Sequence, residues 1–196
     1  MTLLVQIGPG LSLPRDELVR LITDAVRHTP SMFNMQSTRV VILFGDSHRD
    51  FWELCTASLP VETLHMRPNV AFEHFDVVRD KLDTLRNGHG TLLFFEDTEV
   101  VEECARRYPA YAAHFETWSD QSSAIGQYAT WLAFTSLSPA IGATLQHYHP
   151  SMDDVRNRLD IPRTWRMTGQ MPFGSVEGPE LPKSFRDDGE LVQVRE

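Results

Sequence analysis

Residues 28–37 read HTPSMFNMQS and join a predicted helix to a predicted buried strand. A connection of this kind in a small domain is usually short and generic. This one instead carries three hydrogen-bonding side chains, Ser31, Asn34 and Gln36, which alternate with two methionines and a phenylalanine. Polar groups interleaved with soft or flat apolar groups suit a planar heterocycle with hydrogen-bonding edges. The alternative interpretation is a capped turn whose polar side chains satisfy its own backbone.

Helices and strands alternate on either side of this connection. Upstream, apolar residues at helical spacing predict a helix over about residues 14–28. Downstream, the continuous apolar run 40–44 predicts a strand buried on both faces. The next predicted element is a helix capped by Asp46 or Ser47 and ended by Pro60, and a second helix around residues 75–85 has a left-handed exit at Gly88. A strand over residues 91–95 and a helix from 97 to about 108 are predicted to follow. This alternation favours layers of helices around one sheet.

The C-terminal half has a different character. Residues 120–137 are apolar or small on every side, so a helix here is expected to be central or to lie at a subunit interface. Strands are predicted over residues 143–146 and 165–171, with a short helix capped by Ser151 or Asp154 between them. Residues 190–195 have strand propensity but no helix to pack on. We expect a single domain over residues 1–196 with a C-terminal arm over 172–196 that finds its partner on another subunit.

Composition and charge exclude several classes of protein. Apolar residues make up 41% of the 196, which is ordinary for a globular domain with one core. The 18 Lys and Arg residues against 27 Asp and Glu give a net charge of -9, which repels nucleic-acid phosphates. No apolar run approaches the length of about 18 residues that a membrane span needs. The N-terminus has no basic region typical of a secretory signal, so a cytoplasmic protein is expected.

Signature motifs of several enzyme classes are missing from the sequence. It contains neither GxGxxG nor GxxxxGK[ST], and neither GxSxG nor HExxH. Cys55 and Cys104 belong to no CxxC or Cys/His tetrad, so no metal site is predicted from them. His147 and His149 would share one face of a strand, either as two metal ligands or as one packed and one solvated side chain. No acid, base or nucleophile of the chain is therefore predicted to be catalytic.

The HTPSMFNMQS stretch resembles the PSxxNxQ loop of the nitroreductase family of FMN-dependent oxidoreductases, and most closely the loop of its fungal-type branch. The resemblance spans about residues 14–186 and continues in the same order through residues 43–45, 93–97, 118–123, 145–148 and 170–174. It implies an α+β fold of three layers, in which helices flank a mixed central sheet. It also implies an interlocked homodimer with FMN bound between the subunits.

The resemblance assigns three groups of residues to FMN. The loop residues that match those holding the ribityl chain and the ring are Pro30, Ser31, Met32, Asn34 and Gln36. Gln146 and His147 match a strand end that faces the flavin from the partner subunit, and Lys183 and Arg186 match a basic pair that binds the phosphate. The family's N-terminal helix and its Arg-Arg element have no counterpart, so either the start is truncated or fewer cations hold the phosphate.

The function implied is electron transfer from NAD(P)H through FMN to nitro, quinone or similar small aromatic acceptors. The flavin would carry the chemistry, while the protein would bind and orient it. The alternative is a non-catalytic or redox-sensing dimer with a weakened flavin site. Flavin binding by the purified protein separates the two.

Overall fold

The computed structural model describes residues 6–11, 13–66, 73–138, 140–178 and 184–195; for residues 60–66 and 73–75 it describes the backbone alone. Its elements are β1 (Gln6–Gly8), α1 (Arg15–Arg27), η1 (Met32–Asn34), β2 (Thr38–Phe44), α2 (Gly45–Met66), α3 (Glu73–Arg86), β3 (Gly90–Asp97), α4 (Thr98–Arg107), η2 (Pro109–His114), α5 (Phe115–Leu137), β4 (Ile141–Ala143), α6 (Met152–Leu159), β5 (Trp165–Glu177) and α7 (Asp188–Leu191).

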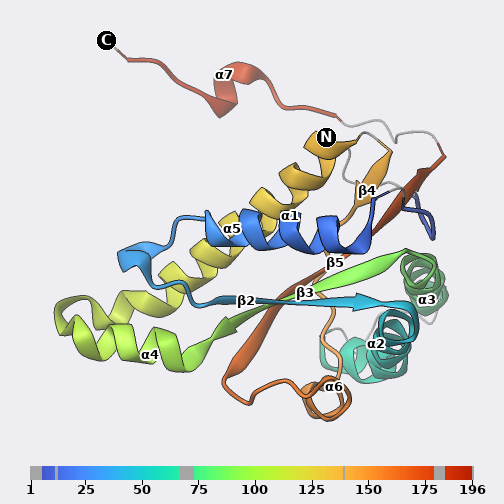
Figure 1. Cartoon of the computed structure of the whole chain (residues 1–196), viewed down its shortest axis with the longest axis horizontal. Helices are drawn as coiled ribbons and strands as arrows, with labels where there is room; N and C mark the ends of the chain where they lie inside the picture. Colours follow the sequence, from blue (N-terminus) through green and yellow to red (C-terminus); the bar gives the residue numbers. More distant parts are fainter. Residues whose placement is uncertain (1–5, 12, 67–72, 139, 179–183, 196) are drawn as a thin grey trace.

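The strands form one sheet in the order β1-β5-β3-β2, and β4 also pairs with β5. Every pairing among the described strands is antiparallel. The α+β class is thus confirmed, but the mixed sheet is not found within the described chain. Helices α2 and α3 connect β2 to β3. The end of β2 pairs with the start of β3, Phe44 with Gly90, so the two strands lie side by side and run in opposite directions (Figure 1).

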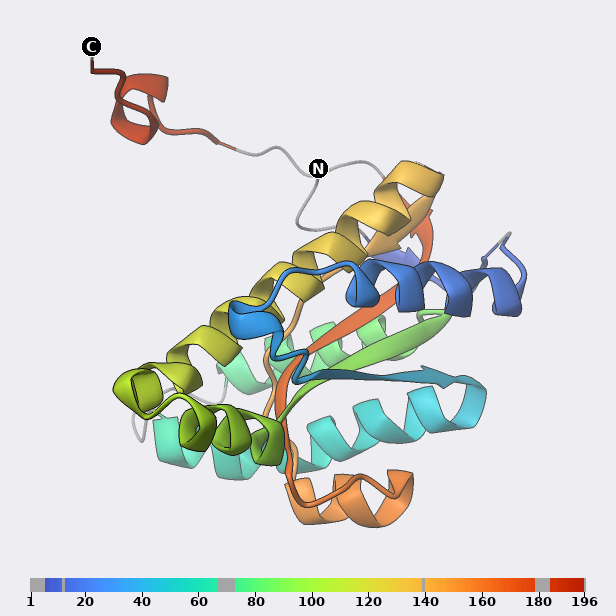
Figure 2. The ribbon, with the colours of Figure 1, turned by 60° about the vertical axis from the view of Figure 1, so that its left-hand side comes forward.

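Helices cover both faces of the sheet, with α1 and α5 on one side and α2, α3 and α6 on the other (Figures 1 and 2). Strand β3 shows why: Leu92 and Phe94 enter the core under α1 and α5, while Leu93 and Phe95 enter the core under α2 and α3. All four side chains are fully buried. A strand buried on both faces needs this continuous apolar run, because successive side chains point to opposite faces.

Most predicted helices and strands are confirmed, but several predicted bounds are wrong. The strand predicted over residues 143–146 is β4 at Ile141–Ala143, and Gln146 forms an isolated bridge with Gln170. Helix α2 continues to Met66, so Pro60 does not end it; proline removes only one backbone donor, and a helix can continue past it. Gly88 is not left-handed, since the described glycines with positive φ are Gly45 and Gly178. A Cβ at Gly88 would lie 3.2 Å from the carbonyl oxygens of Leu85 and Phe173. A side chain there would be tightly packed against two backbone carbonyl groups.

The C-terminal segment also differs from the prediction. Residues 172–177 belong to β5, so the arm begins later than expected. Within residues 190–195 the chain finishes the short helix α7 and then runs on with no strand pairing of its own. The arm extends away from the rest of the chain (Figures 1 and 2). Among the described residues, no helix combines the length and hydropathy that a membrane crossing requires.

Candidate functional site

The loop between α1 and β2 has an unusual backbone. Phe33, Asn34 and Gln36 have φ values of 54°, 53° and 51°, in the left-handed region that non-glycine residues rarely adopt. Among the described residues only Asp160 shares this property outside the loop. Such strain persists where surrounding contacts fix the backbone, and it concentrates at binding sites.

Part of the loop is a turn in which polar groups of the loop form hydrogen bonds with its own backbone, as the alternative interpretation predicted. The backbone N–H of Gln36 donates to Oγ of Ser31 over 2.9 Å, and η1 closes two further backbone bonds. The side chain of Gln36 is exposed nonetheless, as are those of Pro30, Met32 and Asn34. The loop therefore has groups to spare for a ligand.

Two acidic residues at the end of β3 hold the exit of the loop. The hydroxyl groups of Ser37 and Thr38 both donate to the carboxylate of Glu96. Arg39 donates to the carbonyl oxygen of Gln36 at 2.7 Å and to Oδ2 of Asp97 at 3.1 Å. Burial raises the pKa of Glu96, and its two hydroxyl partners offset part of that rise. This network fixes the backbone on the C-terminal side of the strained residues.

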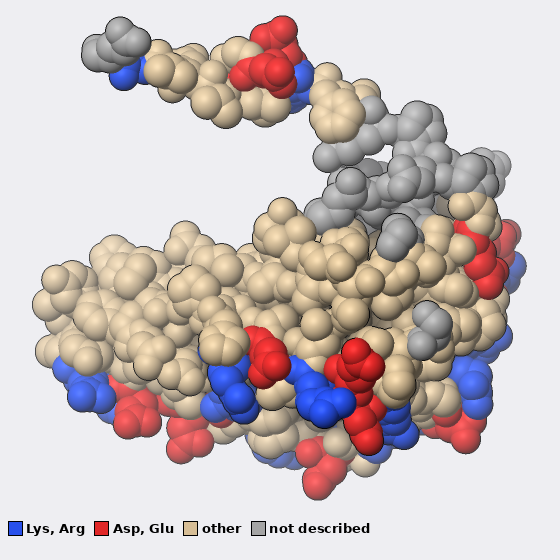
Figure 3. All heavy atoms as spheres, turned by 45° about the horizontal axis from the view of Figure 1, so that its top comes forward, with Lys and Arg blue, Asp and Glu red and all other residues tan. Residues whose placement is uncertain are grey.

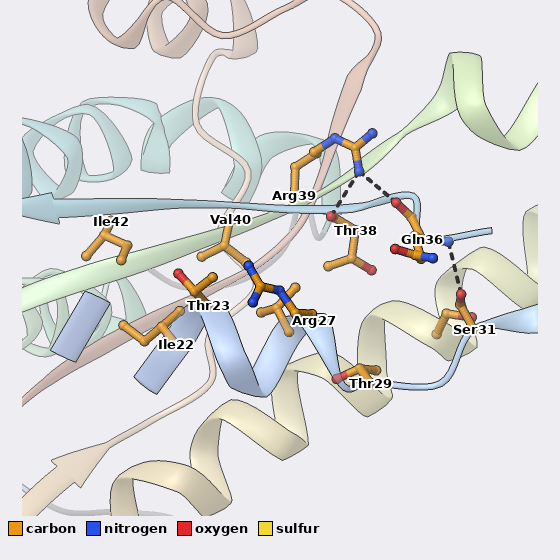
Figure 4. A pocket seen from close by; sticks show the side chains of 12 residues that line it. Ile22, Thr23, Arg27, Thr29, Ser31, Gln36, Thr38, Arg39, Val40 and Ile42 are labelled. Carbon is orange, nitrogen blue, oxygen red and sulfur yellow. Dashed lines mark hydrogen bonds between the residues drawn. The ribbon is translucent and has the colours of Figure 1, made fainter. Parts of the chain in front are cut away.

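A cavity of about 360 Å³ opens beside the loop, between α1 and β2. Ser31 and Gln36 lie at one end, and the aliphatic side chains of Ile22 and Ile42 lie at the other (Figure 4). Arg27 of α1 also lines it. The cavity thus combines hydrogen-bonding groups, a cation and an apolar wall.

The other predicted flavin residues lie elsewhere in the chain. His147 lines a second cavity of about 200 Å³, to which neither Ser31 nor Gln36 contributes. Gln146 is buried, with its side chain donating to Oγ1 of Thr144 at 2.8 Å. One chain therefore does not bring the loop and the 146–147 strand end into a single cavity.

The predicted phosphate-binding pair is only partly described. Lys183 lies outside the described residues. Arg186 lies on the arm, 80% exposed, with its guanidinium 3.5 Å from the carboxylate of Glu190. Their role in binding phosphate stays a prediction.

Sequence reasoning missed an aromatic cluster that packs on the loop. The ring of Phe33 stacks on Tyr108 with centroids 4.5 Å apart, and Tyr111, Phe115 and Trp118 surround it at 5.6 to 6.0 Å. A signal was present, because these four residues follow one another at spacings of three and four, typical of one helical face. The break at Pro109 hid it.

Helix α5 has one buried face and one exposed apolar face. Ile125, Tyr128 and Leu132, at spacings of three and four, are 45%, 51% and 39% exposed. On the face that Figure 3 shows, charged side chains gather along the lower part, and a broad area above them carries none. The helix is not buried on all sides within one chain, so its predicted place at a subunit interface stays a prediction.

Comparisons with known proteins agree on one family. Residues 12–175 match the sequence profile of the Nitroreductase family. The chain is 31% identical over 182 residues to nitroreductase FRM2 of Saccharomyces cerevisiae, covering 92% of this chain and 84% of the yeast protein. Its fold is similar to that of nitroreductase CinD of Lactococcus lactis in complex with nicotinic acid, with a TM-score of 0.83, 32% identity and coverage of 98% and 94%.

Further solved structures carry other ligands. CinD has also been solved in complex with chloramphenicol and with 4-nitrophenol. A putative nitroreductase of Desulfovibrio desulfuricans in complex with FMN shares the fold, with a TM-score of 0.62, 19% identity and coverage of 97% of this chain and 91% of that one. In the described part of this chain, no three His, Cys, Asp or Glu residues are grouped so as to hold a metal ion.

Proposed function

Because the chain belongs to the nitroreductase family, and its yeast relative supports the fungal-type branch, we propose that it is an FMN-dependent NAD(P)H oxidoreductase that reduces nitro, quinone or similar aromatic acceptors. Its general class, an oxidoreductase of the nitroreductase type, follows from the family itself. The cofactor, the reductant and the acceptors are the proposed part.

The observation that carries this proposal is the strained loop beside its cavity. Ser31, Asn34 and Gln36 offer side-chain donors and acceptors from a backbone held in place by Glu96 and Asp97. Met32 is 43% exposed beside them and offers apolar contact. These groups fit a flavin, whose ribityl hydroxyls and ring edge need hydrogen bonds and whose ring needs apolar contact. When bound, FMN supplies two-electron transfer between nicotinamide and acceptor.

The chain's own residues bind and orient the flavin in this proposal. Ser31, Asn34 and Gln36, with Pro30 and Met32, hold the ribityl chain and the ring. Lys183 and Arg186 hold the phosphate through charge-assisted hydrogen bonds. Arg186 would exchange its exposed ion pair with Glu190 for the phosphate, at little cost because exposed pairs contribute little to stability.

A homodimer is the second part of the proposal. The loop and the 146–147 strand end line different cavities in one chain, so a flavin that contacts both would need a second copy. The exposed apolar face of α5 supplies a surface for that copy. Among the described strands, β2 pairs on one side only, and the arm residues Val192 and Val194 are 71% and 85% exposed. An arm that adds a strand at the partner's β2 edge would interlock the two chains.

The acceptor class rests on the aromatic surroundings of the loop and on relatives. The exposed ring of Phe33 and its cluster offer stacking surfaces to flat molecules. CinD, at 32% identity, binds 4-nitrophenol and chloramphenicol. We therefore expect nitroaromatic compounds to be reduced.

The test is the absorption spectrum of the purified protein with an equilibrium titration of FMN. A yellow protein with a flavin spectrum, bleached by NADH or NADPH and restored by a nitroaromatic compound, is the expected result. A colourless dimer that ignores added FMN would overturn the proposal and favour the non-catalytic alternative.

A further inference from the structure

The second cavity is strongly cationic in an acidic protein. It lies between the first residues of β5 and the segment that leads into α6, and its volume is about 200 Å³. Arg156, Arg163 and Arg166 line it together with His147 and His149, and no Asp or Glu does. The whole chain carries a net charge of -9, so this local excess of positive charge is not a consequence of composition.

The arginines are incompletely paired. Nη1 of Arg156 lies 3.4 Å from Asp153, but its Nε is buried without a hydrogen-bond partner. Arg166 pairs with Asp120 in a half-exposed contact. Arg163 has no ion pair among the described residues. Arg156 and Arg163 therefore have guanidinium donors beyond these contacts, which can serve an anion in the cavity.

The lining of the cavity also contains aromatic and sulfur-containing side chains. Tyr148 and Trp165 line it with Met152 and Met167. An apolar cavity of about 150 Å³ holds a benzene ring. A cavity of about 200 Å³ therefore has room for one ring with one or two small substituents, and not for a nucleotide.

Hydrogen bonds within the chain hold two of the segments that line the cavity. The side-chain amide of Gln170 forms two hydrogen bonds with the backbone of Tyr148. It accepts from the N–H at 2.8 Å and donates to the carbonyl oxygen at 3.0 Å. The backbone N–H and the hydroxyl of Thr98 both donate to the carbonyl oxygen of Thr164 at 2.8 Å, which anchors the turn that carries Arg163. A preorganised site loses less entropy on binding.

We propose that this cavity binds a small aromatic acid, with its carboxylate held by Arg156 and Arg163 and its ring against Tyr148 and Trp165. The planar guanidinium matches a carboxylate, and the aromatic side chains match the ring. The inference rests on the proposed function in one respect: it makes acidic aromatic compounds the preferred acceptors. Reduction of a nitro group to a nitroso group takes two electrons and two protons and releases one water molecule. NAD(P)H supplies both electrons and one proton as a hydride, and solvent supplies the second proton.

Isothermal titration calorimetry of the full chain, as purified, tests the proposal with two probes of nearly equal shape, 4-nitrobenzoate and the neutral 4-nitrobenzamide. We expect the acid to bind at least about 10-fold more tightly than the amide. Arg163→Gln and Arg156→Gln should each weaken binding of the acid about 10-fold or more and leave binding of the amide unchanged. Arg79→Gln, on the exposed surface of α3, is the matched control and should change neither.

Equal affinities for the acid and the amide would overturn the inference. An equal loss of affinity for both probes in the arginine variants would also overturn it. Arg163 is exposed, so its variant is expected to fold even where Arg156→Gln does not. Calorimetry needs no electron transfer. If the protein prefers the acid but binds no FMN, the proposed function is wrong and this inference holds. If the protein is yellow and active but does not prefer the acid, the proposed function holds and this inference is wrong.

Discussion

The hydroxyl of Ser37 donates a hydrogen bond to the buried carboxylate of Glu96, 59 residues away in the sequence. Oγ1 of Thr38 donates to the second carboxylate oxygen over 2.6 Å. These two bonds join the exit of the strained loop to the end of β3. Glu96, which is fully buried, is therefore one of the two acidic residues that fix the exit of the candidate flavin loop.

Glu96→Ala should destabilise the fold, because it leaves two hydroxyl groups without their acceptor. The loss in free energy of unfolding is expected to be about 1–3 kcal/mol or more. Glu103→Ala, at an exposed position on α4, is the control and should change it by less than about 0.5 kcal/mol. Urea denaturation measures both, and equal effects of the two variants would refute the role given to Glu96.

Glu96→Gln tests the protonation of the same site. Burial raises the pKa of Glu96 above its ordinary value of 4.5, so the folded protein holds this proton more tightly than the unfolded chain. The favourable contribution is complete below pH about 4 and is lost as the pH rises through the folded-state pKa. Glutamine does not titrate. The stability of Glu96→Gln relative to wild type should therefore increase between pH 4 and pH 7, and a constant difference would contradict this.

His48 is predicted to make the fold sensitive to acid. The ring donates from Nε2 to the carbonyl oxygen of Arg86 at 3.0 Å, so in the neutral form Nδ1 accepts from the Thr91 hydroxyl at 2.8 Å. The indole of Trp52 donates to that same hydroxyl oxygen. Burial lowers the pKa of His48 from 6.5 to about 4.

A histidine with a lowered pKa stabilises the fold above its unfolded pKa and loses that contribution as the pH falls towards the folded value. The free energy of unfolding should drop by about 3 kcal/mol between pH 7 and pH 4 on account of His48. In His48→Gln this part of the pH dependence should disappear, whereas the exposed His28→Gln should keep it. Urea denaturation across this range is the measurement, and identical profiles for wild type and His48→Gln would count against the assignment.

The parts of the fold that depend on local pattern could be predicted from the sequence. The apolar run 40–44 and the periodic residues of α1 and α5 each encode their element without help from the rest of the chain. The surroundings of Gly88 could not be predicted in this way, because the carbonyl of Phe173, more than eighty residues away in the sequence, packs closely against it. Strand β1 was missed because three residues carry no periodicity.

The candidate flavin loop could be predicted from the sequence, whereas the cationic cavity could not. The loop was found because Ser31, Asn34 and Gln36 lie within one short stretch of sequence. The cationic cavity was not found from the sequence, because its arginines lie on a helix, a turn and a strand that meet only in the folded chain. These arginines are Arg156, Arg163 and Arg166. Single arginines carry no signal in a sequence where most charged residues face solvent.

Ile125→Glu should dissociate the proposed dimer. It places a charge at the centre of the exposed apolar face of α5, where an interlocked interface of about 2,000 Å² or more would bury it. Light scattering at micromolar concentration should give twice the chain mass for wild type and one chain mass for the variant. Val77→Glu, at a position 68% exposed on α3, is the control and should remain dimeric. A wild-type protein with the mass of one chain would refute the dimer.

Lys183→Ala should weaken FMN binding, because the lysine is assigned to the phosphate. Loss of one charge-assisted hydrogen bond costs about 1.5–3 kcal/mol. The dissociation constant should therefore rise roughly 10- to 150-fold in an equilibrium titration. Arg195→Ala on the same arm should leave it unchanged, and unchanged affinity in Lys183→Ala would contradict the assignment.

His147→Ala tests whether the chain supplies a proton to the proposed reaction. If one face of the flavin serves nicotinamide and acceptor in turn, the two cannot bind together, and initial-rate plots should give parallel lines. General acid–base catalysis contributes about 10²–10⁴-fold. If His147 only shapes its cavity, His147→Ala with FMN bound should lose less than about a thousandfold of the single-turnover rate of flavin reduction or reoxidation, whereas a larger loss would make His147 a proton donor.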